Sequence, residues 1–226
     1  MNKRMQAIVK YMESGRGVID VGTDHGYFPT WMASHGYKGN IIASDINASP
    51  LQKAMETARE AGVEDKIRFQ LCDGLDSCPP DLVDTIVIAG MGGELIASIL
   101  SRAPDLSGIN LVLQPNTREP ELYVWLRKNG YEIAAQKACE DGKFVYLVFK
   151  AHRAESKVPQ ECSELESIAG KLDIRLEESK KYIRRKINRI ESAAAGMRKQ
   201  CAFPPCRQLR RACRKAKGVS VGRRFA

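Results

Sequence analysis

Along residues 1–150, short continuous apolar runs alternate with apolar residues at helical spacing. A short continuous run is typical of a strand buried on both faces, and recurrence every three to four residues is typical of an amphipathic helix. The spacing of Met5, Ile8, Val9 and Met12 predicts a first helix over 2–13. The runs predict strands at 17–22, 40–45, 66–71, 83–90 and 109–114, and the spacings predict helices at 28–35, 49–62, after the fourth strand through Leu100, and about 119–129.

Two further strands are predicted at about 131–138 and 143–149, on either side of the turn Glu140-Asp141-Gly142. Five strand–helix units followed by a hairpin describe a doubly wound sheet, mostly parallel, with an antiparallel strand added last. The expected fold class is therefore α/β.

The pattern changes after Lys150. Residues 163–199 carry one long helical pattern with a seven-residue repeat, and the chain from 201 to 226 has no periodicity. The repeat favours a coiled-coil-like extension, and a plain helix lying on the domain explains it equally well. We therefore expect a first domain over 1–150, a helical extension over 151–200 and a disordered basic tail over 201–226. The repeating positions are Ala169, Leu176, Ile183, Ile190 and Met197, with Leu165 and Leu172 four residues before two of them.

Composition narrows the class of protein. The 226 residues are 43% hydrophobic and 28% charged, which is typical of a soluble globular chain. No apolar run reaches the roughly 20 residues of a membrane span, and the N-terminus lacks the apolar core of a signal peptide. Seven cysteines without an export signal indicate reduced thiols, so a cytoplasmic location is expected. No metal site is expected, since Cys201, Cys206 and Cys213 have no nearby histidine.

Charge is unevenly distributed. Residues 1–150 hold 16 basic and 19 acidic side chains, whereas residues 151–226 hold 20 basic and 8 acidic ones. Such a basic segment attracts polyanions, nucleic acid first among them, although a solvated tail without a specific partner has the same composition.

The end of the first predicted strand carries candidate binding chemistry. Gly22 and Gly26 lie where the strand turns into a helix, and glycines there allow a tight turn and the close approach of a ligand. Asp20 and Asp24 in the same segment would repel a pyrophosphate. They suit a cationic or zwitterionic ligand, such as an amino acid moiety beside a sulfonium.

The next strands end in residues of matching chemistry. Asp45, followed by Ile46, ends the second strand and is placed to accept hydrogen bonds from ribose hydroxyls. Asp73, before Gly74, could accept from an adenine amino group. Each feature alone also fits an ordinary turn or helix cap. Together with the Ala89-Gly90-Met91 segment after the fourth strand, they predict a site for S-adenosylmethionine (SAM) at the carboxyl edge of the sheet.

Six segments then point to one family: DVGTDHGYFP (20–29), IIASDINASPLQKA (41–54), CDGL (72–75), TIVIAGMGGELIASIL (85–100), LVLQPN (111–116) and EDGKFVYLV (140–148). They resemble the bacterial tRNA (adenine-N1)-methyltransferases that modify adenine 22 in the D-arm. The resemblance spans roughly residues 3–150 and implies a Rossmann-like class I methyltransferase fold, SAM as methyl donor and tRNA as substrate. It implies contacts to the methionine end of SAM by Gly22, Asp24 and His25, to the ribose by Asp45, to the adenine by Asp73 and Gly74, and a floor of the reaction site made of Ala89, Gly90 and Met91.

The residues also suggest catalytic roles. The methylated adenine is cationic, so we expect Asp24 to stabilise the developing charge and His25 to orient Asp24 or take a proton. His25 could equally be a helix-start residue. Gln114 and Asn116 could hydrogen-bond the adenine edge, or could belong to a simple turn.

N1 lies on the pairing edge of adenine, so the base must be unpaired or flipped out. Tyr27, Phe28 or Trp31 could stack on it, with a core role favoured for Phe28 and Trp31. The tRNA backbone requires cations, for which the candidates are Arg4, Arg118, Arg127, Lys128 and the basic segment 180–189.

Two alternatives to this function stay open at this point. One is a SAM-dependent methyltransferase acting on another RNA site or a small molecule, and the other is a non-catalytic RNA-binding protein with a vestigial methyltransferase fold. We expect a monomer, or a weak dimer formed through the C-terminal helix.

Overall fold

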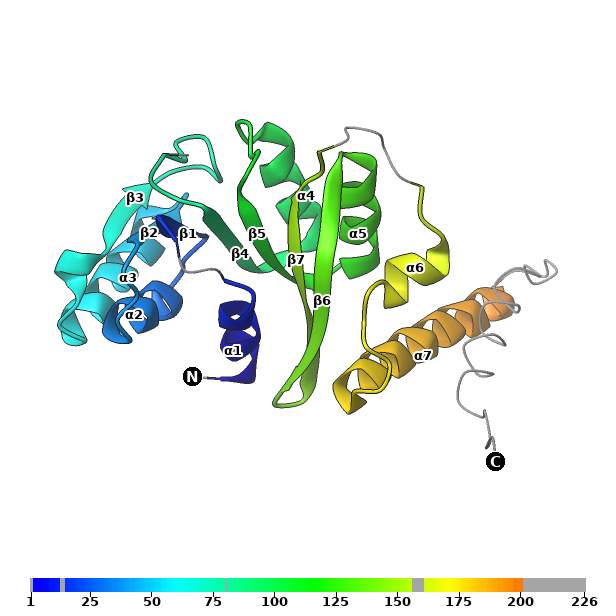
Figure 1. Ribbon diagram of the computed structural model, residues 1–226. Helices are drawn as coiled ribbons and strands as arrows, with labels where there is room; N and C mark the ends of the chain where they lie inside the picture. Colours follow the sequence, from blue (N-terminus) through cyan, green and yellow to red (C-terminus); the bar gives the residue numbers. More distant parts are fainter. Residues whose placement is uncertain (1, 13–14, 80, 156–160, 201–226) are drawn as a thin grey trace, which may run out of the picture.

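One mixed seven-stranded sheet forms the centre of the computed structural model, which describes residues 2–12, 15–79, 81–155 and 161–200 (Figure 1). The strand order is β3-β2-β1-β4-β5-β7-β6. β7 is antiparallel to both of its neighbours, and the other pairs are parallel. The predicted fold class is confirmed. The strands are β1 (Gly17–Val21), β2 (Asn40–Asp45), β3 (Arg68–Leu71), β4 (Thr85–Gly92), β5 (Asn110–Thr117), β6 (Tyr131–Asp141) and β7 (Phe144–Arg153).

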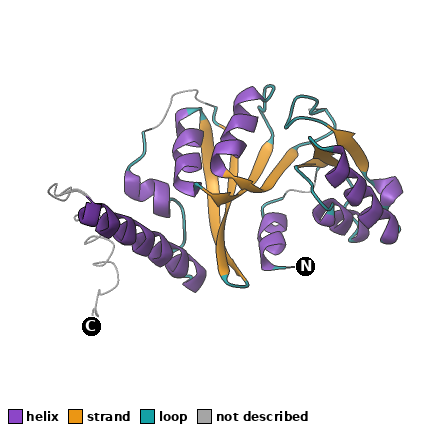
Figure 2. Ribbon diagram, turned by 180° about the vertical axis from the view of Figure 1, so that it is seen from behind, coloured by secondary structure: helices purple, strands orange, loops and turns teal. Residues whose placement is uncertain are grey.

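Helices cover both faces of the sheet (Figures 1 and 2). One apolar core packs the helices α1, α2 and α3 against one face, and a second core packs α4, α5 and the C-terminal segment against the other. Both faces of the central strands are therefore buried. The helices are α1 (Lys3–Lys10), α2 (Tyr27–Ser34), α3 (Ala48–Glu60), the short 3-10 helix η1 (Glu64–Lys66), α4 (Gly93–Arg102), α5 (Glu119–Lys128), α6 (Glu164–Ala169) and α7 (Glu177–Gln200).

The register of β1 brings the candidate residues to one edge. All five residues of β1 are buried; Val18 belongs to the core under α1 and α2, and Ile19 belongs to the opposite core. Asp20 lies level with Ala43 of β2 and Val87 of β4. Because parallel strands end at the same edge, the segments that follow β1, β2 and β4 meet there.

Most of the predicted elements are confirmed, and the differences have local causes. β3 starts at Arg68 because Glu64–Lys66 forms η1. β5 continues to Thr117, past the predicted end at residue 114, and includes Pro115. β5 pairs with β7 only over Leu111–Leu113, so at Pro115 the neighbouring strand is β4 alone. The backbone N–H that proline lacks is therefore not needed for a hydrogen bond to β7.

The prediction of one helix over 163–199 is wrong. α6 ends at Ala169 and α7 begins at Glu177, so the seven-residue repeat is not carried by a continuous helix. Gly170 has φ 45°, and a Cβ there would lie 1.9 Å from Oε1 of Gln136 in β6. The same oxygen accepts a hydrogen bond from the Lys171 backbone N–H. This contact fixes a sharp turn that a helix could not follow.

The alternative prediction, a helix lying on the domain, describes α7 better. Tyr182 is buried in the core against the sheet, and Ile183 packs beside it. Lys186 forms a largely buried ion pair with Glu119, at 2.6 Å, and Lys181 pairs with Glu140 of β6. α7 is thus fastened to both the sheet and α5. β7 extends to Arg153, past the predicted domain boundary at Lys150.

Residues 201–226, including Cys201, Cys206 and Cys213, lie outside the described residues. In the part of the chain that is described, no helix is long and apolar enough to cross a membrane. The same residues contain no cluster of three histidine, cysteine or acidic side chains suited to a metal ion.

Candidate active site

The turn after β1 has an unusual backbone. Gly22, Asp24 and Gly26 have φ of 72°, 50° and 68°, so three residues of a five-residue turn adopt the left-handed conformation. A Cβ on Gly22 would lie 2.0 Å from Cε of Met91, and one on Gly26 would lie 2.8 Å from Cα of Ala54. The two glycines therefore satisfy both a conformational and a space requirement, as predicted for a turn of this kind.

Asp20 is a buried carboxylate at the start of this turn. Its pKa is raised to about 6, chiefly by burial; the neighbouring Thr23 hydroxyl lowers the pKa in part, and the Asp45 carboxylate adds to the rise. An ionised carboxylate in such a place is stabilised by a cation. The site is therefore prepared for a positively charged group.

Asp45 links the ends of β1 and β2. Its Oδ1 accepts from the Asn47 backbone N–H at 2.9 Å, and its Oδ2 accepts from the Asp24 backbone N–H at 3.4 Å. The carboxylate thereby holds the first turn against β2. Ile46 is 59% exposed next to it, which leaves an apolar surface beside the carboxylate.

Asp73 has a different environment. Its two oxygens accept from Arg102 of α4 at 2.9 and 3.0 Å, and this guanidinium lowers the pKa of the carboxyl. Both side chains are 45% exposed. Gly74, at φ 60°, packs over Ile99 of α4. No pattern in the sequence predicts the Arg102 contact.

The ends of β4 and β5 form a hydrogen-bonded unit. Asn116 donates from Nδ2 to the Gly90 carbonyl at 2.6 Å. Gln114, which is fully buried, donates from Nε2 to the Pro115 carbonyl at 2.9 Å and to Oδ1 of Asn116 at 3.1 Å. Its Oε1 accepts from Nη1 of Arg4 at 3.4 Å. The Gln114 carboxamide is thus occupied by protein partners.

A pocket of about 400 Å³ joins the turn after β1 to the end of β4, and we call it the β1–β4 pocket. Its walls include α1, so the first helix closes one side of the site. Its lining residues are Asn2, Arg4, Met5, Ile8, Asp20, Gly22, Thr23, Asp24, His25, Tyr27, Phe28, Val87, Ala89, Gly90, Met91 and Asn116.

Many of the predicted site residues line the pocket, but some do not. The predicted residues outside its lining are Gly26, Trp31, Asp45, Ile46, Asp73, Gly74, Gln114, Arg118, Arg127 and Lys128. The prediction missed Asn2, Met5, Ile8, Thr23 and Val87. A signal for α1 was present in the sequence, because Asn2 caps the helix by accepting from the Met5 backbone N–H at 2.8 Å.

The aromatic and charged residues at the pocket mouth differ in exposure. The Asp24 side chain is 71% exposed, and its Oδ2 lies 3.8 Å from Nε2 of His25. The His25 ring stacks on Tyr27, which is 62% exposed, with 5.5 Å between centroids. Phe28 is buried in the core, and Trp31 is partly buried and stacks on His35. Of the three candidate stacking residues, Tyr27 alone presents an open ring to the solvent.

Arg118 lies apart from this pocket. It precedes α5 with φ 58° and pairs with Glu121 at 3.0 Å and Glu94 at 3.6 Å. It lines a separate cavity of about 570 Å³ between α5, α6 and α7, together with Lys186 and Arg189. Arg118 is therefore not placed to contact a ligand of the β1–β4 pocket directly.

The residues fit a SAM-like ligand in chemistry. The buried Asp20 carboxylate suits a cationic group, and the glycine at position 22 lets the Met91 side chain at the end of β4 approach the turn closely. Asp45 and Asp73 follow at the ends of β2 and β3, so carboxylates stand at three successive strand ends. Carboxylate oxygens at these places can accept hydrogen bonds from an ammonium group, from ribose hydroxyls and from an adenine amino group in turn.

Comparison with known proteins agrees with this geometry. The family model "Methyltransferase domain" matches residues 1–149. The tRNA (adenine(22)-N(1))-methyltransferase of Bacillus subtilis (strain 168) is 32% identical over 157 residues, which cover 69% of this chain and just under two thirds, 66%, of that protein. A candidate tRNA methyltransferase of Mycoplasma pneumoniae is 28% identical over 174 residues, covering 75% of this chain and 79% of its own.

Solved structures match over nearly the whole chain. A candidate tRNA (m1A22) methyltransferase of Streptococcus pneumoniae superimposes with a TM-score of 0.81 at 26% identity, covering 97% of this chain and 98% of that one. Its complex with SAM superimposes with a TM-score of 0.79 at 25% identity and the same coverage. The B. subtilis m1A22 tRNA methyltransferase shares the fold, with a TM-score of 0.76 at 24% identity over 97% and 96% of the two chains. The chain therefore belongs to the methyltransferase domain family, and the resemblance predicted from its motifs is confirmed.

Proposed function

We propose that this chain transfers the methyl group of SAM to N1 of adenine 22 in the D-arm of tRNA. The observation that carries the proposal is the β1–β4 pocket, which joins a buried carboxylate and a glycine turn to the end of β4. The name of the B. subtilis relative and the SAM complex of the pneumococcal protein support the choice of acceptor and donor.

The cofactor residues follow from the order of the strand ends. SAM, when bound, supplies a methyl group already activated by its sulfonium. Asp20 and the Gly22–Gly26 turn bind the cationic amino acid end, and Asp45 with Ile46 holds the ribose. Asp73 and Gly74 bind the adenine. Ala89, Gly90 and Met91 form the floor beneath the reacting atoms.

The acceptor residues lie at the mouth of the same pocket. Adenine N1 carries a lone pair at neutral pH, so the chain needs to position the base rather than deprotonate it. Tyr27 stacks on the base, Asn116 lies on the β5 side, and Asp24 stabilises the positive charge that develops on the ring. His25 orients Asp24. Gln114 acts indirectly, since its partners are Asn116 and Arg4.

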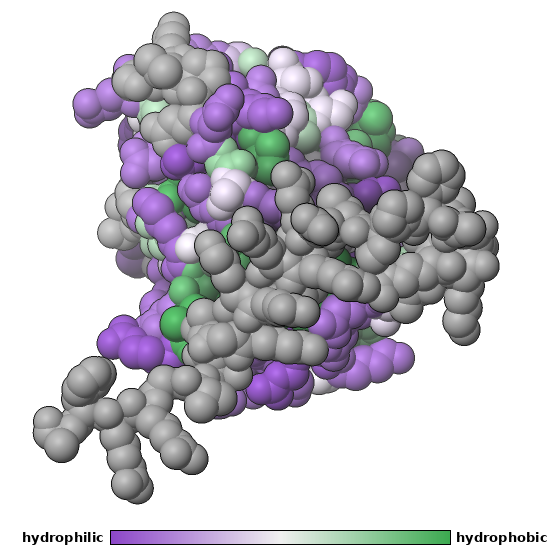
Figure 3. Space-filling model, turned by 90° about the vertical axis from the view of Figure 1, so that its right-hand side faces the viewer, coloured by the Kyte–Doolittle hydropathy of each residue, from purple (hydrophilic) through white to green (hydrophobic). Residues whose placement is uncertain are grey.

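The proposal also includes how the tRNA docks, where in the cell the protein acts, and its oligomeric state. A tRNA substrate requires a cytoplasmic enzyme, and phosphate contacts come from basic residues around the pocket and along α7. We expect residues 1–150 to hold the catalytic site and 151–200 to assist docking. In Figure 3, which views the molecule from the side of α7, the visible described residues are mainly hydrophilic, with some hydrophobic residues among them. We expect a monomer, or a weak dimer formed through the C-terminal helix.

The test uses the full chain, labelled SAM and two unmodified bacterial tRNA transcripts that differ only in having adenosine or guanosine at position 22. We expect label in the first transcript alone, and 1-methyladenosine in its nucleoside digest by mass spectrometry. Calorimetry with SAM is run on the same preparation. Intact SAM binding without label in the adenosine transcript would refute the acceptor, and labelling of both transcripts would refute the position.

A further inference from the structure

The lining of the β1–β4 pocket carries charges of both signs. Asp20 and Asp24 come from β1 and the turn that follows it, whereas Arg4 comes from α1. A Cβ on Gly90 would lie 3.9 Å from Nη1 of Arg4, so the guanidinium lies beside the end of β4. Among the described lining residues, Arg4 is the one side chain with a permanent positive charge.

Contacts with other side chains hold Arg4 in place without neutralising its positive charge. Its guanidinium carbon lies 5.5 Å from the centroid of the Tyr146 ring in β7, and Nη1 donates to Oε1 of Gln114 at 3.4 Å. Both partners are uncharged. No carboxylate of the described residues lies within ion-pair distance of this guanidinium. Arg4 is therefore a partly buried cation, held in place by neutral groups, at the wall of a pocket.

A guanidinium has five N–H donors in a planar fork, and one of them is used here. The fork matches the oxygens of a carboxylate or a phosphate in two parallel hydrogen bonds. Placing a cation in a partly dry pocket without an anion costs free energy, which a bound anion returns. We propose that Arg4 is the oxyanion-binding residue of the β1–β4 pocket.

Two ligands of the proposed function carry such an oxyanion. One is the α-carboxylate at the amino acid end of SAM, and the other is a backbone phosphate of the tRNA nucleotide that enters the pocket. The carboxylate would complete a zwitterion site, with Asp20 facing the ammonium and Arg4 facing the carboxylate. The identity of these ligands rests on the proposed function, but the presence of an anion site does not.

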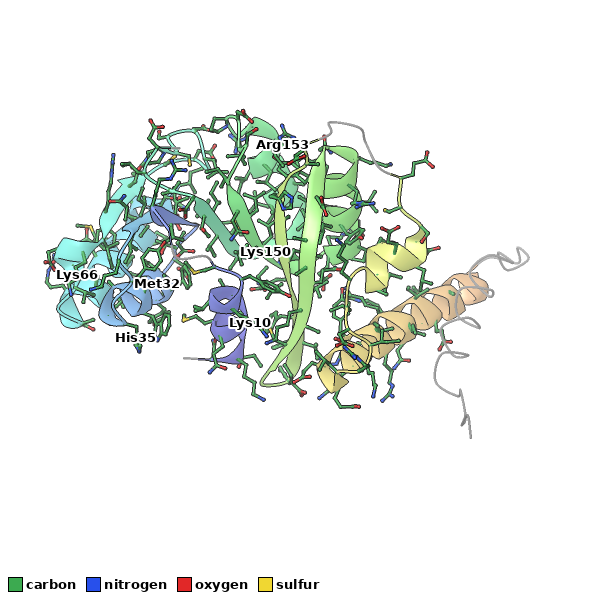
Figure 4. All side chains as sticks on the ribbon, in the orientation of Figure 1. Lys10, Met32, His35, Lys66, Lys150 and Arg153 are labelled. Carbon is green, nitrogen blue, oxygen red and sulfur yellow. The ribbon has the colours of Figure 1, made fainter. Side chains whose placement is uncertain are left out.

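The experiment compares Arg4→Gln with Lys10→Gln in the full chain. Both variants remove one positive charge from α1, and Figure 4 shows Lys10 on that helix. Calorimetry measures the Kd of SAM and of decarboxylated SAM, which lacks the carboxylate. Methylation assays at saturating SAM measure KM and kcat for tRNA. Arg4→Lys, which keeps the charge but loses the fork, serves as a second variant if the glutamine variant folds poorly.

If the carboxylate is the ligand, Arg4→Gln weakens SAM binding about 10- to 100-fold and leaves the binding of decarboxylated SAM unchanged. If a phosphate is the ligand, SAM binding is unchanged and KM for tRNA rises by a similar factor, with kcat nearly constant. Lys10→Gln changes none of these values. Equal behaviour of the Arg4 and Lys10 variants in every assay would overturn the proposal. If the wild type does not methylate the tRNA, the proposed acceptor is refuted. The calorimetric comparison of SAM with decarboxylated SAM would still test the anion site.

Discussion

Asp20 and Asp73 are carboxylates at comparable places, one at the end of β1 and the other just after β3, yet their surroundings are opposite. Asp20 is buried, and burial raises its pKa to about 6. Asp73 is half exposed, and the fork of Arg102 lowers its pKa. Position in the fold alone therefore does not determine what a strand-end carboxylate does.

The difference indicates how each residue uses its charge. The pKa of Asp20 is raised by burial and by the Asp45 carboxylate, and no cation of the described residues lowers it, so a cationic ligand would supply what its environment lacks. Asp73 already has its counter-ion, which leaves it as an oriented hydrogen-bond acceptor of modest strength. We therefore expect Asp20 to contribute more to the free energy of SAM binding than Asp73.

The largest effect is expected for Asp20→Asn. The variant keeps the shape of the side chain but removes the buried negative charge that, in the proposed function, binds the cationic end of SAM. Truncating one partner of a buried charge pair costs at least about 2 to 5 kcal/mol, so the Kd of SAM should rise about 100-fold. Calorimetry at pH 7.5 measures it. Asp65→Asn, an exposed carboxylate of η1, is the control and should bind SAM as the wild type does. A rise of less than threefold would contradict the role of Asp20.

The same variant should be more stable than the wild type when no ligand is present. A folded-state pKa of about 6, against an ordinary value near 3.8, means that ionised Asp20 opposes folding. The cost is fully present above pH 6, shrinks as the pH falls towards 4, and is absent below that. It amounts to about 3 kcal/mol from the two-unit shift.

Thermal and urea unfolding of the ligand-free wild type and Asp20→Asn at pH 7.5 and pH 4.5 measure this stability. We expect the variant to gain up to about 3 kcal/mol at pH 7.5 and distinctly less at pH 4.5. A variant that is less stable than the wild type at both pH values would show that Asp20 is held by a favourable partner in the free protein.

The sheet and the first turn could be predicted because their signals are local. Apolar runs locate the strands, and the spacing of Gly22 and Gly26 after β1 indicates a tight turn. Gly170 was a local signal too, but the seven-residue repeat across it looked continuous. The spacing of apolar residues carries no information about Gln136, which is distant in the sequence and occupies the space that a continuous helix would need.

The long-range contacts at the strand ends could not be predicted in the same way. Arg4 meets Gln114 across 110 residues of sequence, and Arg102 meets Asp73 across 29. No periodicity connects such pairs, because the sheet brings them together only after every strand is in register. Gln114, for which a contact with the adenine edge was one of two predictions, is buried and hydrogen-bonded within its own chain.

The smallest effects are expected at the adenine end. Asp73→Asn removes the charge and replaces one of the two acceptor oxygens with an NH2 donor. It should weaken SAM binding about tenfold, since one hydrogen bond to a charged group contributes about 1.5 to 3 kcal/mol at most. Arg102→Ala leaves the carboxylate in place but releases its orientation, and because the pair is half exposed it should weaken SAM binding only two- to threefold.

Calorimetry on these variants and on the double variant tests whether Arg102 works through Asp73. If it does, the double variant binds SAM no more weakly than Asp73→Asn alone. Additive losses would mean that Arg102 contacts the ligand itself. An Asp73→Asn effect as large as that of Asp20→Asn would overturn the ranking of the two carboxylates, because an exposed and already neutralised group would then contribute as much as a buried, unpaired one.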